Sequence, residues 1–68
     1  MGEKLGLVKV YNKKRGYGII QAENRDYFFR WTDIISTSHK ECKTGEQVIF
    51  IPQEHMRGLR AVNVQALG

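Results

Sequence analysis

The 68-residue sequence contains one cysteine, one proline and no long apolar run. Cys42 has no partner for an internal disulfide, so packing alone must hold the fold together, as is usual in a reducing compartment. The longest apolar run, from Val48 to Ile51, is far too short to span a membrane. The N-terminal residues lack the apolar segment and cleavage site of a secretory signal, so we expect a cytoplasmic protein with no membrane partner.

Acidic residues are fewer than basic ones. Seven Asp and Glu residues stand against 11 Lys and Arg residues, which gives a net charge of +4. A basic protein favours a polyanionic partner such as nucleic acid or an anionic surface. The hydrophobic fraction of 41% is typical of a soluble globular protein, and the length predicts a single domain, residues 1–68, with a small core.

Short apolar stretches alternate with polar turns along the chain. Five short strands and no long helix most simply close into a barrel, because closure removes exposed strand edges. The sequence therefore predicts an all-β fold, a small five-stranded antiparallel barrel. The expected strands run from Leu7 to Asn12, from Tyr17 to Ala22, from Asp26 to about Arg30, from Gln47 to Ile51 and from Leu59 to Leu67.

The later connections are less regular. Residues 36–44 are expected to form a long loop, in which Ser38 and Glu41 have the spacing of a helix capping box. Pro52 either ends the fourth strand or lies where no hydrogen-bond donor is needed. The last strand alternates strictly in sequence, which predicts Ala61 and Asn63 on one face and Val62 and Val64 on the other.

Aromatic residues gather on the second and third expected strands. Because side chains alternate across a strand, Tyr17 shares a face with Ile19, and Phe28 shares a face with Arg30. In the hairpin these two faces coincide, and Trp31 lies at the edge. So much ring and guanidinium surface in water is typical of a base-stacking surface, although a register slip of one residue would place Phe28 in the core.

A basic cluster adjoins this face. Lys13, Lys14 and Arg15 are consecutive in the turn that follows the first strand. The cluster is either an ordinary solvated turn or a lip that contacts phosphate, and the sequence leaves both interpretations open. Gly16 and Gly18 flank Tyr17, which indicates either a barrel corner or a close approach of another group.

Metal and catalytic chemistry have little support. His39 and Cys42 have a ligand-like spacing and His55 adds a third donor, but no fourth sulfur or imidazole completes a zinc site. No third residue orients a Cys/His nucleophile pair, and a filled barrel of this size offers no evident cleft. We therefore expect no metal, no cofactor and no enzymatic activity, and we interpret Cys42 as a small buried hydrophobe.

The motifs resemble the bacterial cold-shock protein family in order and spacing, over almost the whole chain. The resemblance implies a cold-shock, OB-type barrel that binds single-stranded RNA or DNA by stacking bases on its surface. It leaves RNA chaperoning and the regulation of transcription or translation open as cellular roles. The matching motifs are Gly6-Leu7-Val8-Lys9, Arg15-Gly16-Tyr17-Gly18-Ile19-Ile20, Asp26-Tyr27-Phe28-Phe29-Arg30-Trp31, Gly45-Glu46-Gln47-Val48-Ile49-Phe50 and Ala61-Val62-Asn63-Val64.

Three ring positions of that family carry no ring here. Val10 stands at a tryptophan position, Ile19 at a phenylalanine position and Arg30 at a histidine position. Stacking is worth about 1–3 kcal/mol per base, so these replacements weaken binding unless others compensate. Tyr17 and Phe28 keep their rings, and the Arg30 guanidinium is planar and stacks on bases.

The resulting prediction is a nucleic-acid-binding face. We expect Tyr17, Phe28 and Trp31 to stack bases, and Arg30 to stack or contact phosphate. RNA and DNA remain equally possible, because a stacking surface accepts any base face. The predicted binding residues are Lys9, Tyr11, Lys13, Lys14, Arg15, Tyr17, Ile19, Phe28, Arg30, Trp31, Arg57 and Arg60.

Protein docking is an alternative from a different class. The family pattern places Ile49 and Ile51 on the outside, as an aliphatic stripe unless the long loop half covers them. Together with Val10 and Ile19, the stripe favours an interaction module that docks on the transcription or translation machinery or on a second copy. We expect a monomer or a weak homodimer.

Overall fold

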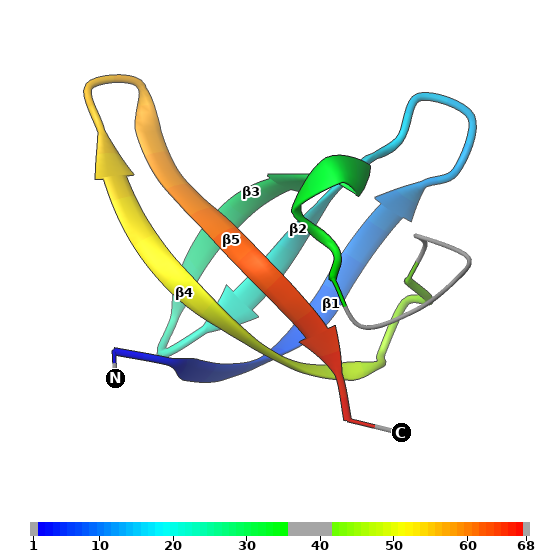
Figure 1. The fold of residues 1–68 in the computed structure, drawn as a ribbon, viewed down its shortest axis with the longest axis horizontal. Coiled ribbons are helices and arrows are strands. Elements are labelled where there is room, and N and C mark those ends of the chain that lie inside the picture. Colours follow the sequence, from blue (N-terminus) through cyan, green and yellow to red (C-terminus); the bar gives the residue numbers. More distant parts are fainter. Residues whose placement is uncertain (1, 36–41, 68) are drawn as a thin grey trace.

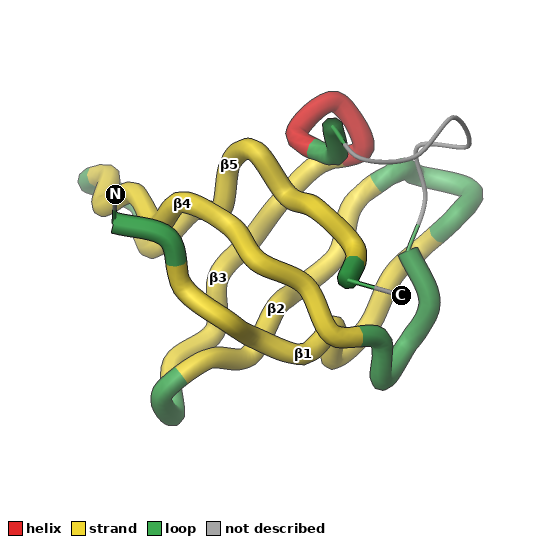
Figure 2. Tube along the Cα trace, turned by 60° about the horizontal axis from the view of Figure 1, so that its bottom comes forward, coloured by secondary structure: helices red, strands yellow, loops and turns green. Residues whose placement is uncertain are grey.

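The computed structural model describes residues 2–35 and 42–67, which form a closed barrel with the strand order β1-β2-β3-β5-β4 (Figures 1 and 2). This confirms the predicted all-β, five-stranded barrel. The expected capping box and His39 lie outside the described residues. The elements are β1 Lys4–Asn12, β2 Tyr17–Ala22, β3 Arg25–Arg30, the 3-10 turn η1 Trp31–Asp33, β4 Gln47–His55 and β5 Gly58–Ala66.

One strand pairing differs from the antiparallel arrangement that the sequence predicts. Strands β1 and β2, β2 and β3, β1 and β4, and β4 and β5 pair antiparallel, but β3 and β5 run parallel, with Phe28 opposite Arg60. The chain leaves β3 through η1 and reaches β5 only after β4, whose hairpin with β5 returns the chain to the edge of β3. This closure brings Arg60 beside an aromatic strand from which it is distant in sequence.

The β2–β3 hairpin has the predicted register. Glu23 and Asn24 have φ angles of 53° and 64°, as a two-residue hairpin turn of type I′ requires. Tyr17 consequently pairs with Arg30, and Ile19 pairs with Phe28.

Strand β4 continues beyond its predicted end, through Pro52 to His55. Its pairing with β1 extends only to Phe50, so Pro52 lies where one side of β4 has no neighbouring strand. A proline is tolerated at such a position, because no partner requires its missing N–H group. The turn to β5 is therefore short, and Met56 and Arg57 form it.

The strict alternation predicted for the last strand is wrong. Ala61 and Val64 are both fully buried, although three positions separate them. Asn63, which lies between them, has a φ of 51°, and the β4–β5 register shifts between Ile49 and Ile51. Asparagine tolerates this left-handed conformation better than most residues, so the strand bulges and turns Val64 inward.

The core consists of apolar and aromatic side chains inside the barrel. The ring of Tyr27 lies 5.0 Å from that of Phe50, and Cys42 is buried, as expected for a small hydrophobe. A Cβ atom on Gly18 would lie 2.6 Å from the Val10 carbonyl oxygen and 2.9 Å from the Phe29 ring, so this glycine marks a close approach. The buried hydrophobic residues are Val8, Ile20, Ala22, Tyr27, Phe29, Ile34, Cys42, Val48, Phe50, Ala61 and Val64.

The described part of the chain lacks two features. None of the helical segments within residues 2–35 and 42–67 is long and apolar enough to cross a membrane. The same residues contain no cluster of three His, Cys, Asp or Glu side chains able to hold a metal ion.

Candidate nucleic-acid interface

The outer face of β2 and β3 carries the predicted rings. The Tyr17 and Phe28 ring centroids lie 5.8 Å apart with the planes inclined at 31°. On the opposite face, Tyr27 and Phe29 are 2% and 0% exposed. The register slip that would bury Phe28 has therefore not occurred. We call Tyr17, Phe28, Arg30 and Trp31 the stacking platform.

Trp31 rests on the loop between β1 and β2. Its backbone N–H donates to the Gly16 carbonyl oxygen at 2.8 Å, and its side chain is half exposed. Gly16 has a φ of 72°, and a Cβ atom there would lie 2.6 Å from Trp31 Cδ1. Only a glycine allows the indole to lie this close to the loop backbone.

A Gly16→Ala substitution should therefore move the indole. Alanine disfavours the left-handed backbone at this position, and its Cβ atom would collide with the Trp31 side chain. We expect these two effects together to lower the free energy of unfolding by about 1 kcal/mol. The fluorescence maximum of Trp31 should shift, and oligonucleotide affinity should fall. Gly45→Ala is the matched control, because Gly45 has a φ of 87° but a Cβ atom there would have no neighbour within 4 Å. Equal spectral shifts in both variants would contradict the proposed support of Trp31.

Two clefts border the platform and share Phe28 and Arg30. The first, of about 200 Å³, is lined by Arg15, Gly16, Tyr17, Phe28, Arg30 and Trp31. The second, of about 420 Å³, lies beside the β4–β5 hairpin. Its lining residues are Phe28, Arg30, His55, Met56, Arg57, Gly58, Leu59 and Arg60.

Two guanidinium groups flank the central ring of the platform. The Cζ atoms of Arg30 and Arg60 lie 5.8 Å and 5.3 Å from the Phe28 ring centroid. Both distances are within the range of cation–π attraction. The platform therefore combines ring surface with planar cations, and both kinds of surface stack on bases.

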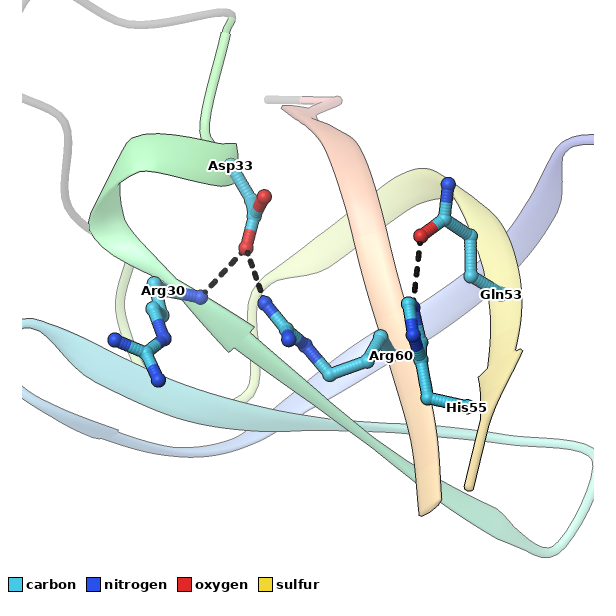
Figure 3. Close-up of polar contacts among 5 residues, drawn as sticks. All are labelled: Arg30, Asp33, Gln53, His55 and Arg60. Atoms are coloured by element: carbon cyan, nitrogen blue, oxygen red, sulfur yellow. Dashed lines mark hydrogen bonds and ion pairs between the residues drawn. The ribbon is translucent and has the colours of Figure 1, made fainter. Parts of the chain in front are cut away.

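Asp33 contacts the backbone of Arg30 and the guanidinium of Arg60, and sequence reasoning missed it. Its Oδ2 accepts a hydrogen bond from the Arg30 backbone N–H at 2.9 Å and lies 3.6 Å from a terminal nitrogen of Arg60 (Figure 3). The only sequence signal was an acidic residue three positions after the end of a strand. Figure 3 also shows His55, whose Nε2 lies 3.0 Å from the Gln53 side-chain oxygen.

The basic loop lies at one end of the platform. Asn12 shapes this loop, because its side-chain oxygen accepts from the Arg15 backbone N–H at 3.0 Å and its carbonyl oxygen accepts from the Gly16 N–H at 2.7 Å. Lys13, Lys14 and Arg15 are exposed. The loop thus presents its cations next to the cleft that contains Trp31.

The other predicted cations differ in their surroundings. Arg57 is exposed at the hairpin turn. Lys9 instead forms an ion pair with Asp26 at 3.2 Å, and both side chains are about half exposed. A phosphate must compete with Asp26 for Lys9, so we expect Lys9 to contribute less than the loop cations.

Tyr11 lies away from the platform. Its ring stacks on the buried Phe29 ring, with centroids 5.8 Å apart and planes inclined at 16°, and it packs against the core. These contacts support a structural role for Tyr11 rather than the predicted contact with nucleic acid.

The aliphatic positions form two separate groups. Val10 pairs with Ile19, and Ile19 pairs with Phe28, so these two residues extend the platform sideways. Ile49 pairs with Leu5 on another part of the barrel, and both Ile49 and Ile51 are only partly exposed. Val10 and Ile19 therefore lie apart from Ile49 and Ile51, and these four predicted docking positions do not form one continuous row.

The ion pair between Lys4 and Glu23 shifts the pKa values of both groups. The Lys4 ammonium lies 2.7 Å from a Glu23 carboxylate oxygen. This hydrogen bond raises the pKa of Lys4 and lowers the pKa of Glu23. Because the pKa of Glu23 is lowered in the folded protein, the ion pair stabilises the fold while Glu23 is ionised. This stabilisation is lost as the pH falls and the carboxylate is protonated. Both groups are exposed, so the contribution to stability is small.

A barrel with rings and cations gathered on one outer face has the features of a nucleic-acid-binding OB-type domain. Residues 4–67 match the family model described as the "'Cold-shock' DNA-binding domain". The chain belongs to the cold-shock domain family, whose members bind nucleic acid.

Named relatives agree with this assignment. A cold shock-like protein of Aquifex aeolicus is 42% identical over 65 residues, covering 93% of each chain. Cold shock protein CspC of Bacillus subtilis is 38% identical over 61 residues, covering 88% of this chain and 92% of the relative. The fold is also similar to drosophila Unr CSD456, with a TM-score of 0.77 and 22% identity; the match covers 97% of this chain but 27% of that longer one.

Proposed function

We propose that this protein binds single-stranded RNA or DNA without catalysis, by stacking unpaired bases on the platform. The observation that supports this most strongly is the shared cleft of about 200 Å³, which Tyr17, Phe28, Arg30 and Trp31 all line. Unpaired bases expose both faces, whereas a duplex hides them in its own stack, so such a surface favours single strands. This binding activity is the one required of a cytoplasmic RNA chaperone or of a regulator of transcription or translation.

The sugar–phosphate backbone of the bound nucleic acid contacts cations at both ends of the platform. Lys13, Lys14 and Arg15 lie at the Trp31 end, and Arg57 lies at the hairpin end. Phosphate contacts from these side chains hold the strand without reading its sequence. Base stacking and phosphate contacts together therefore predict binding that tolerates many sequences and depends on salt.

Trp31 is the only tryptophan and provides a direct test of this function. Short oligo-U and oligo-dT should quench its fluorescence to saturation, because a stacked base contacts the indole. Each phosphate contact on a single strand contributes about −0.7 to the slope of log K against log salt. Contacts from the loop cations and Arg57 thus predict a slope of about −2 to −3.

Anisotropy of a labelled oligonucleotide gives the independent check. If neither quenching nor binding appears at low salt, the proposed function is wrong. The protein-docking alternative would then be tested next by substitutions at Val10 and Ile19, which lie side by side on the outer face.

A further inference from the structure

Arg60 occupies a position that general phosphate binding does not explain. It lies on β5 opposite Phe28, and its Cζ is 5.3 Å from the Phe28 ring centroid. Asp33 lies 3.6 Å from one terminal nitrogen. The Nε is buried and has no hydrogen-bond acceptor among residues 2–35 and 42–67. Because the Nε is buried, only the terminal N–H groups of Arg60 can reach a ligand in the cleft that this residue lines.

The surroundings of Arg60 suit a base better than a phosphate. The cleft of about 420 Å³ has apolar walls from Phe28, Met56 and Leu59. Its volume lies in the range of ordinary small-molecule sites. Met56 is fully exposed at the hairpin turn, where it costs free energy in water unless an apolar surface covers it. A flat base on Phe28 would contact these walls, with its edge near the arginine.

The chemistry of the arginine fork restricts which base fits best. Two parallel N–H donors match two adjacent acceptors, and the O6 and N7 atoms of guanine provide such a pair. Adenine places an amino donor next to N7, and thymine or uracil has a single acceptor, O4, on the corresponding edge. We infer that Arg60, positioned by Asp33, selects guanine for the base that stacks on Phe28. This inference rests on the proposed function.

The test compares oligonucleotides that differ at one base. A labelled oligo-dT with a single central dG should bind about tenfold more tightly than oligo-dT itself, which is within the discrimination expected of one bidentate contact. Central dA or dC should give no such gain. Hypoxanthine keeps O6 and N7 and should retain the gain, whereas 7-deazaguanine lacks N7 and should lose it. A gain with 7-deazaguanine, or an equal or larger gain with dA or dC, would overturn the inference.

Two protein variants assign the effect to Arg60. Arg60→Lys keeps the charge but removes the fork, so the preference for guanine should vanish while the salt slope on oligo-dT stays the same. Arg25→Lys is the matched control, because Arg25 is exposed on β3 and lines neither cleft, and its preference should persist; thermal melts confirm that both variants fold. A preference that survives in Arg60→Lys overturns the inference. Equal affinity for all four bases also overturns it but leaves the proposed function intact, whereas no binding of any oligonucleotide refutes the proposed function itself.

Discussion

Replacing Phe28 with alanine is expected to weaken binding of oligo-dT or oligo-U by about 1–3 kcal/mol, the usual value of one stacked base. Phe28 is the central ring of the platform, because it lines both clefts and contacts Tyr17 and the two arginines. Its side chain faces outward, so the free energy of unfolding should change little. Fluorescence or anisotropy titrations and a urea melt measure the two quantities.

Phe29→Ala provides the opposite result at the adjacent position. Phe29 is fully buried, and removing such a ring costs about 3–5 kcal/mol of stability. A domain of this size has only a few kcal/mol of stability, so the variant should be largely unfolded at 25 °C. If instead Phe28→Ala loses stability and keeps its affinity, the assignment of Phe28 to the binding face is wrong.

Adding a ring at Val10 is expected to strengthen binding. Val10 is 46% exposed and pairs with Ile19, which in turn pairs with Phe28, so a ring there extends the platform across β1. Val10→Trp should gain about 1–3 kcal/mol of binding free energy, if one more base stacks. Anisotropy of a labelled oligonucleotide measures the gain. Intrinsic fluorescence is unsuitable here, because the signals of Trp31 and the new indole would overlap.

Leu5→Trp serves as the control for nonspecific effects of a new indole. Leu5 is also exposed on β1, but it pairs with Ile49 and lies outside the platform. We expect no change in its affinity. Equal gains in the two variants would mean that any exposed indole attracts the oligonucleotide, and the platform would then not extend to Val10.

The sequence predicted the parts of the structure that depend on local patterns. Alternation in β2 and β3, together with a short polar turn, was sufficient to place Phe28 outward and Phe29 inward. The glycines around Tyr17 were recognised as points of close approach or curvature, and the structure explains each by a contact with Trp31 or Phe29. These features involve residues close together in the chain.

Features that depend on distant residues were not predictable in this way. Asp33 became important only because closure of the barrel brings Arg60 to it. The parallel pairing of β3 with β5 follows from the path of the whole chain, which no local pattern contains. The bulge at Asn63 was hidden because its neighbouring valines follow an ideal alternation in sequence.

The parallel closure has a consequence for the stability of the domain. Within the described residues, β3 and β5 share one ladder pair, Phe28 with Arg60, and a separate parallel bridge joins Ile34, after η1, to Val64. The barrel therefore has a narrow seam, and the larger cleft lies over it with walls from both sides. A nucleotide bound there would contact residues of both β3 and β5. Its binding would therefore stabilise the closed barrel relative to forms in which these two strands separate.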